Sequence, residues 1–268
     1  MRYVVNSHWH ADHTHGNQAF PDAQLIASAN TRRDVMQIDL PSLNRSLSIT
    51  QTQLKQLRQD LRKQSDDALE KRSREQIKAR EDYLQTISQL KILAPFVTLD
   101  DNLTIQEGTQ EARLLYLGTG HTDGDIILFL PVQKIAFVGD LFFNKALPNV
   151  ADASILQWMK TLEELLQLNA GKFVPGHGPV GTKKDVEAFL RYFEELRSLV
   201  EPAVDRGDSL EQVTRELQVP EKYSSYQFQN FFPSNVQKMY SEIKALRLAL
   251  TPAEDASKTG PKQPLRQK

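Results

Sequence analysis

The sequence predicts an α/β protein that is interrupted by a long helical segment. From residue 97 onward, short β-prone runs alternate with amphipathic helical stretches. Residues 42–94 contain neither Gly nor Pro. Most histidines stand beside predicted strand ends, where α/β folds gather functional side chains. The length of 268 residues suits one large domain or two small ones.

The first predicted elements are a strand at residues 2–5, a polar, His-rich turn at residues 6–17 and a second short apolar run at residues 24–27. The apolar core of a signal peptide is not found at this start, so the sequence as written predicts a cytoplasmic protein. A longer form with an export signal upstream of Met1 would instead be secreted or periplasmic.

Residues 42–94 predict a helical hairpin, or one long bent helix, that projects from the body. Pro41 and Pro95 flank this segment and are the expected helix limits. The polar character between the apolar positions favours a solvated insertion that packs on itself, with a homodimer arm or a lid over a site as functional alternatives. Two stripes at helical spacing carry the apolar side chains, namely Leu47, Leu54, Leu57, Leu61 and Ala68, and then Ile77, Leu84, Ile87 and Lys91.

The remaining elements follow in order, with strands at residues 103–106, 112–117, 125–130, 134–138 and 172–174. Helices are predicted at residues 154–168, 183–201, 208–218 and 234–250, and the hydroxyl of Ser154 is expected to cap the first of them. An aromatic cluster at residues 223–232 either lines a pocket or packs the last helix onto the body. Residues 251–268 predict a disordered tail, which leaves a single domain over residues 1–250.

Composition excludes several classes of protein. The chain has 33 Lys and Arg and 34 Asp and Glu. A protein that binds nucleic acid needs an excess of basic residues to contact the phosphates, so no nucleic-acid partner is expected. The longest apolar run, residues 126–130, is far shorter than the roughly 20 residues of a membrane helix, so no membrane partner is expected either. The absence of Cys excludes disulfides, Cys-ligated zinc, iron–sulfur clusters and thiol nucleophiles.

The histidines point to a metal site. Four of the six lie within residues 8–15, and His121 and His177 each follow a predicted strand beside a Gly. Asp140 has a similar place, directly after Gly139 and the predicted strand at residues 134–138. Imidazole nitrogens and carboxylate oxygens, with no thiolate, suit zinc and also iron or manganese.

The spacing of these residues predicts two ions. His8 and His10 are two apart, so in an extended chain they point the same way and can hold one ion. Asp12 and His13 follow in the next turn and can reach a second ion about 3.5–4 Å away. The remaining ligands would be His121 for the first ion, His177 for the second and Asp140 as a bridge, which leaves His15 as an orienting residue, a substrate contact or a structural histidine.

These motifs resemble those of the metallo-β-lactamase-fold hydrolases. The resemblance covers about residues 2–200, apart from the insertion, and implies an αββα sandwich with a two-metal site at one edge of the paired sheets. It implies the same ligand sets: His8, His10 and His121, then Asp12, His13 and His177, with Asp140 bridging. Family members normally carry further strands upstream, so the first sheet is expected to lack its N-terminal strands. The matching motifs are His8-x-His10-x-Asp12-His13, Gly120-His121-Thr122 with Asp123-Gly124-Asp125, Gly139-Asp140 and Pro175-Gly176-His177-Gly178.

The resemblance implies a hydrolase with two Zn²⁺ ions and a small-molecule substrate. Two cations lower the pKa of a bridging water, so that hydroxide at neutral pH can attack an ester, thioester, lactone or amide carbonyl. Asp12 is the expected catalytic residue, since it can relay a proton to the leaving group. Acceptors that orient the imidazoles are expected among Asn6, Ser7, Thr122, Asp123 and Asp125.

Two alternatives come from the same resemblance. The ligand set also resembles that of mono-iron persulfide dioxygenases, which are oxidoreductases of this fold, and the expected lack of upstream strands allows an inactive truncated fragment. Among hydrolases, Asp140 favours relatives of the glyoxalase-II-type thioesterases over dedicated β-lactamases, which use Cys or lack the bridging Asp. The residues after Asp140, however, contain no Arg-rich glutathione-binding run.

Overall fold

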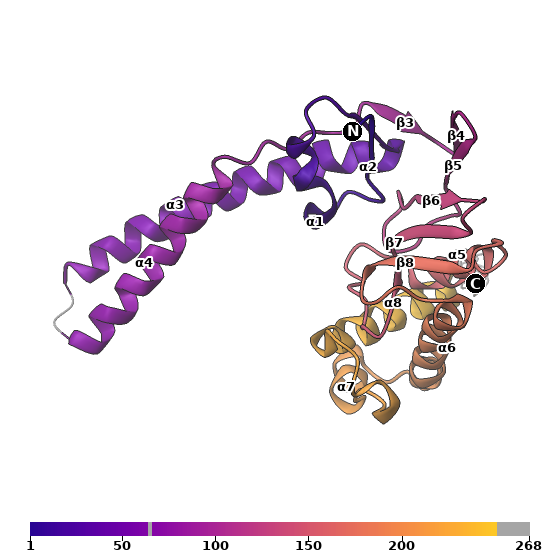
Figure 1. The fold of residues 1–268 in the computed structure, drawn as a ribbon. Helices are drawn as coiled ribbons and strands as arrows, with labels where there is room; N and C mark the ends of the chain where they lie inside the picture. Colours follow the sequence, from indigo (N-terminus) through magenta and orange to yellow (C-terminus); the bar gives the residue numbers. More distant parts are fainter. Residues whose placement is uncertain (64–65, 251–268) are drawn as a thin grey trace, which may run out of the picture.

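A computed structural model of the protein describes residues 1–63 and 66–250 and contains two β-sheets that pack face to face (Figure 1). The first sheet is parallel, in the order β1-β2-β3, with β1 (Tyr3–Val5), β2 (Gln24–Ser28) and β3 (Val97–Leu99). The second sheet has the order β4-β5-β6-β7-β8 and is antiparallel except for the parallel pair β7–β8. Its strands are β4 (Asn102–Glu107), β5 (Gln110–Leu115), β6 (Ile127–Leu130), β7 (Ile135–Phe143) and β8 (Lys172–His177). The predicted tail lies outside the described residues.

Helices cover the outer faces of both sheets. The helices α5 (Ile155–Leu165), α6 (Lys183–Arg206) and α8 (Phe232–Leu250) pack on the second sheet around the larger core, and α7 (Leu210–Glu216) packs on α8. The short helix α2 (Ala29–Asp34) lies against the first sheet. A smaller core between the sheets contains Ile26, Leu99, Leu114 and Ile126. The predicted αββα sandwich is therefore confirmed.

The first sheet is narrower than the second. Strand β1 pairs only with β2, so its other edge is free among the described residues. A groove of about 570 Å³ lies beside that edge, and Tyr3, Val5 and Ile105 are among its apolar lining residues. Phe137, on the inner strand β7, is 41% exposed there. Part of the apolar face of the second sheet is thus left uncovered.

Strand β7 is longer than predicted, and this changes the position of Asp140. The strand continues through Gly139 and Asp140 to Phe143, with irregular register on both sides of Gly139. Gly139 has a φ of +51°, which glycine adopts at little cost, and the buried residues after it continue the strand. The prediction that Asp140 directly follows a strand was wrong, because the strand bends at Gly139 instead of ending.

The predicted helical hairpin is confirmed, although its limits differ. Helices α3 (Leu40–Leu61) and α4 (Asp67–Ile87) pack together and project away from the sheets (Figure 1). A π-helical turn, Val35–Asp39, runs directly into α3, so Pro41 does not start the helical segment. Pro41 is the second residue of α3 and thus lies inside a continuous helical segment. At the other end, α4 stops at Ile87, well before Pro95.

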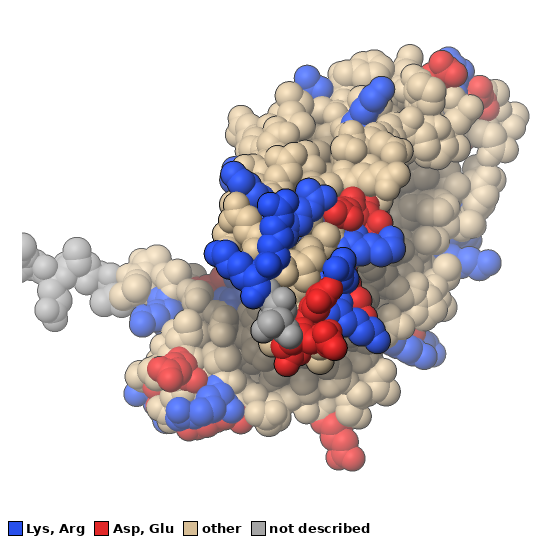
Figure 2. Space-filling view, turned by 90° about the vertical axis from the view of Figure 1, so that its left-hand side faces the viewer, with Lys and Arg blue, Asp and Glu red and all other residues tan. Residues whose placement is uncertain are grey.

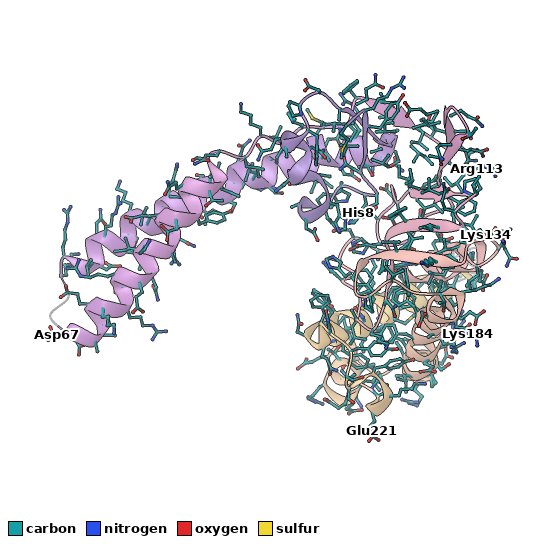
Figure 3. All side chains as sticks on the ribbon, viewed as in Figure 1. His8, Asp67, Arg113, Lys134, Lys184 and Glu221 are labelled. Carbon is teal, nitrogen blue, oxygen red and sulfur yellow. The ribbon has the colours of Figure 1, made fainter. Side chains whose placement is uncertain are left out.

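The surface of the hairpin is mostly polar. Of the two predicted apolar stripes, only Leu54 and Ile77 are buried. Seen end-on, the hairpin shows both acidic and basic side chains (Figure 2). An exposed ion pair, Arg58–Glu81, joins its two helices. The tip at Asp67 lies far from His8 (Figure 3), so the hairpin does not cover the histidines as a lid. A homodimer through the insertion stays a prediction. Nowhere in the described ranges is a helix both long and apolar enough to cross a membrane.

The first turn of α5 is capped differently from the prediction. Ser154 has the N-cap position, but its hydroxyl makes no capping hydrogen bond. Instead, the amides of Ile155 and Leu156 each donate to a carboxylate oxygen of Glu242 on α8, at 2.9 Å. The prediction for Ser154 was wrong because a side chain distant in the sequence supplies the acceptors.

Candidate metal centre

The seven predicted ligand residues lie together where the two sheets meet, in the region of His8 in Figure 3. Four of them come from the segment after β1, and the others from the loop between β5 and β6, from β7 and from the end of β8. Each of three subsets offers ligand atoms within 4.8 Å of one another. These subsets are His8, His10 and His121; His8, His13 and Asp140; and Asp12, His13 and His177.

In the first subset, three ring nitrogens converge. The Nδ1 atom of His10 lies 3.0 Å from Nε2 of His8 and 2.9 Å from Nε2 of His121. His8 and His121 are fully buried. Burial, together with the neighbouring imidazoles, lowers the pKa of His8 well below its usual value and that of His121 to about 3. Both rings are therefore neutral at pH 7, as metal ligands must be.

The outer nitrogens of these rings determine where the protons are. Asp152 Oδ2 lies 3.0 Å from His10 Nε2, and the backbone carbonyl of Asn149 lies 3.0 Å from His121 Nδ1. A carbonyl or an ionised carboxylate only accepts, so both outer nitrogens carry the proton. The inner nitrogens of His10 and His121 then face each other at 2.9 Å with lone pairs alone. A cation held between these nitrogens would satisfy both lone pairs.

The second group combines imidazoles with carboxylates. His13 Nε2 lies 3.3 Å from Asp12 Oδ2 and 3.3 Å from Asp140 Oδ1. His177 Nε2 lies 3.2 Å from Asp12 Oδ2 and 3.5 Å from Asp140 Oδ2. Within the described part of the chain, His13 Nε2 and Asp140 Oδ1 are buried without a hydrogen-bond partner. Buried polar atoms are rarely left unpaired, so this pair also fits a cation.

The charges of this second group follow from its environment. The neighbouring imidazole of His13, 3.3 Å away, lowers the pKa of Asp12 below its usual range, so this half-exposed carboxylate is ionised. Burial lowers the pKa of His13, but Asp12 and Asp140 outweigh burial and the pKa is raised. Burial raises the pKa of Asp140, because a carboxylate that is 4% exposed loses its hydration. A cation would reverse both raised values.

Gly176 is needed for the approach of these groups. A Cβ atom at this position would lie 1.8 Å from Asp140 Oδ1 and 3.0 Å from His13 Cε1. We expect Gly176→Ala to displace Asp140 and to remove most zinc from the purified protein, as measured by elemental analysis. Gly16→Ala is the matched control, because its Cβ would meet nothing within 4 Å. Equal zinc content in both variants would contradict the placement of an ion beside Asp140.

Of the five predicted orienting residues, only Ser7 contacts a ring nitrogen of the cluster, with its Oγ 3.1 Å from His8 Nδ1. Asn6 Nδ2 donates to the backbone carbonyl of His13 at 2.8 Å and so holds the turn itself. Thr122 donates through its amide and its hydroxyl to Asp125, both at 2.8 Å, and burial raises the pKa of Asp125 to about 7. Asp123 accepts from Arg33 at 2.7 Å.

Sequence reasoning missed Asp152 and Asn149, which orient His10 and His121. Both lie in the irregular loop between β7 and α5, where no periodicity or motif distinguishes them. His15 lies outside the three subsets. Its Nε2 atom pairs with the buried Asp39 at 3.0 Å, which is a structural contact between the His-rich segment and the base of the hairpin.

The aromatic cluster at residues 223–232 serves mainly in packing. Tyr223 is buried and its hydroxyl donates to Glu195 at 2.6 Å. Phe228 is the exception, since it is 39% exposed and its ring centroid lies 5.9 Å from that of His177. It adds an apolar surface beside the second group of ligands.

The chain is similar in sequence to several known proteins. A curated metallo-β-lactamase type 2 from Bacillus sp. (strain 170) is 35% identical over 94 residues, which is 33% of this chain and 37% of that protein. The enzyme of the same name from Bacillus cereus is 34% identical over 94 residues, with the same coverage. The chain thus spans little more than a third of the curated relatives it matches. A solved metallo-β-lactamase from Pontibacter korlensis is 23% identical, with a TM-score of 0.48 over 72% of this chain and 69% of the other.

The family match extends over a much longer part of the chain. The sequence model of the family described as "Metallo-beta-lactamase superfamily" matches residues 1–177. This range contains both sheets and all seven clustered residues. The chain belongs to the metallo-β-lactamase superfamily.

Proposed function

We propose that this protein is a zinc-dependent hydrolase that uses two ions to cleave an ester, thioester, lactone or amide bond of a small molecule. The observation that carries the proposal is the convergence of imidazole nitrogens and carboxylate oxygens in three subsets whose ligand atoms lie within 4.8 Å of one another. The facing nitrogens of His10 and His121 are 2.9 Å apart, and His13 Nε2 and Asp140 Oδ1 are buried without a hydrogen-bond partner among the described residues. Membership in the superfamily supports a metal-dependent hydrolase.

The donor atoms suit the proposed metal. One ion would be held by His8, His10 and His121, and the other by Asp12, His13 and His177, with Asp140 between them. Nitrogen and oxygen ligands without sulfur fit zinc, and iron or manganese would fit the same set. Bound ions of this kind lower the pKa of water and polarise a carbonyl group.

The chain itself supplies proton transfer and substrate contacts. The Asp12 side chain is 59% exposed and its pKa is lowered, so it is an ionised carboxylate, which can accept the proton that the attacking water releases and pass it to the leaving group. A cavity of about 260 Å³ lies beside Asp152 and is lined in part by Trp9, Ile38 and Arg33. Such a mixed apolar and polar wall suits part of a small organic substrate.

Two measurements test the proposal. Elemental analysis of protein purified without added metal is expected to give about two zinc per chain, whereas one iron per chain would contradict it. Zinc-loaded protein is then assayed with esters, thioesters, lactones and β-lactams, the last because the curated relatives are named metallo-β-lactamases. Hydrolysis of at least one class, abolished by a chelator and restored by zinc, is expected. Hydrolysis that survives complete metal removal would contradict the proposal.

A further inference from the structure

Helix α5 and the loop before it contact several parts of the metal centre. The loop supplies Asp152 to His10 and the carbonyl of Asn149 to His121, both at 3.0 Å. The Ser154 amide donates at 3.1 Å to the carbonyl of Gly120, the residue before His121.

The body of α5 continues these contacts. Trp158 is fully buried, and its Nε1 donates at 3.1 Å to the carbonyl of Leu141, the residue after Asp140. The rings of Trp158 and His121 have centroids 5.5 Å apart. The position of α5 therefore sets the position of the groups that orient the first ligand subset.

The start of α5 is held by Glu242 on α8. The two carboxylate oxygens accept separately from the amides of Ile155 and Leu156, at 2.9 Å each. A carboxylate at a helix N-terminus forms charge-assisted hydrogen bonds and interacts favourably with the helix dipole. The Glu242 side chain is only 17% exposed, and Ile243 beside it is buried in the main core. Glu242 is thus a rigid anchor for the first turn of α5.

We propose that Glu242 is a positioning residue for the ion held by His8, His10 and His121. This inference rests on the proposed function. Glu242 does not touch the ligands but fixes the first turn of α5, which keeps Asp152 and Asn149 in place against the imidazoles. Without the Glu242 carboxylate, the amides of Ile155 and Leu156 lose their acceptors and the loop before α5 gains conformational entropy. Metal binding must then order this loop, which lowers the affinity for the ion.

The inference predicts an effect on one ion only. Among the described residues, no hydrogen bond or ion pair joins the loop at residues 149–154 to Asp12, His13 or His177. The second ion should therefore bind Glu242 variants as it binds the unsubstituted protein. A general loss of stability would instead weaken both binding steps.

The test is stepwise zinc affinity, measured by competition with a chromophoric chelator on the full chain. Glu242→Ala is expected to weaken one binding step about tenfold, since loss of groups that orient metal ligands costs about 10–100-fold in affinity. Glu242→Gln keeps one acceptor oxygen and should lie between Glu242→Ala and the unsubstituted protein. Glu164→Ala, an exposed carboxylate on the same helix, should leave both steps unchanged. The absorption spectrum of cobalt-loaded Glu242→Ala should also differ, because the ligand field at the first ion changes.

The outcomes separate this inference from the proposed function. Unchanged affinity and cobalt spectrum in Glu242→Ala, with only a lower unfolding temperature of the metal-free protein, would overturn the inference alone. Unsubstituted protein that binds no zinc would overturn the proposed function and the inference with it. If Glu242→Ala does not fold, the stepwise zinc affinity of Glu242→Gln is measured instead. An affinity equal to that of the unsubstituted protein in both steps would overturn the inference.

Discussion

Replacing His10 with Ala is expected to abolish hydrolysis and to remove one bound ion per chain. The Nδ1 atom of His10 lies within 3.0 Å of the facing nitrogens of both His8 and His121, so it is the shared member of the first subset. A bound ion supplies several kcal/mol of transition-state stabilisation, so kcat/KM should fall about a thousandfold or more. The measurements are zinc content and the initial rate on the best substrate of the panel.

His15→Gln is the matched control for this variant. His15 belongs to the same His-rich segment but pairs with Asp39 and lies outside the three ligand subsets. Glutamine keeps a donor toward Asp39, so zinc content and rate should both stay close to those of the unsubstituted protein. A rate that survives in His10→Ala would refute the mechanism. An equal loss in His15→Gln would show that the segment responds to any substitution.

Removing the metal is expected to lower the free energy of unfolding by about 4 kcal/mol for each bound ion, when compared with protein in zinc at about 1,000 times its dissociation constant. The structural reason is the buried Asp140, whose Oδ1 atom and the facing Nε2 of His13 have no hydrogen-bond partner among the described residues. Without a cation, the folded state keeps a buried carboxylate whose Oδ1 atom has no hydrogen bond, whereas the unfolded state solvates it. Denaturant unfolding with zinc and with a chelator measures the difference.

Asp140→Asn separates the effect of the charge from general damage to the fold. Asparagine has nearly the same shape but needs no counter-charge, so metal-free Asp140→Asn should be at least as stable as the metal-free unsubstituted protein. Zinc should stabilise the variant less than it stabilises the unsubstituted protein. Equal stability of the unsubstituted protein with zinc and with chelator would contradict a cation at this position.

The sequence by itself determined the fold class and the set of clustered residues. The His-rich segment after β1, and the Gly-flanked residues His121, Asp140 and His177, carry strong local patterns of residue type and spacing. Because β5, β7 and β8 run in the same direction, residues toward their C-terminal ends lie near the same sheet edge, and these patterns sufficed to predict the cluster. The helical hairpin was predictable for a similar reason, since its periodicity extends over many turns.

Local signals failed where a contact from elsewhere in the chain decides the structure. Strand β3 has only three residues and exists because it pairs with β2. Strand β7 continues past Gly139 because its last residues are buried between β8 and the helices. Pro41 did not start the helical segment, because the preceding π turn leads directly into α3. In each case tertiary packing outweighed the secondary-structure preference of the local sequence. A short sequence window carries no information about such packing.

Only the tertiary structure decided how the clustered residues are held. Asp152 is 142 residues from His10 in the sequence, and Glu242 is 87 residues from Ile155. A ring N–H or the first amides of a helix need only an acceptor at the right place in space. Many residue types can supply that acceptor, so no sequence pattern predicts which residue does. The ligands of a metal site can be recognised by type and spacing, whereas the groups that orient them are selected by position after the chain has folded.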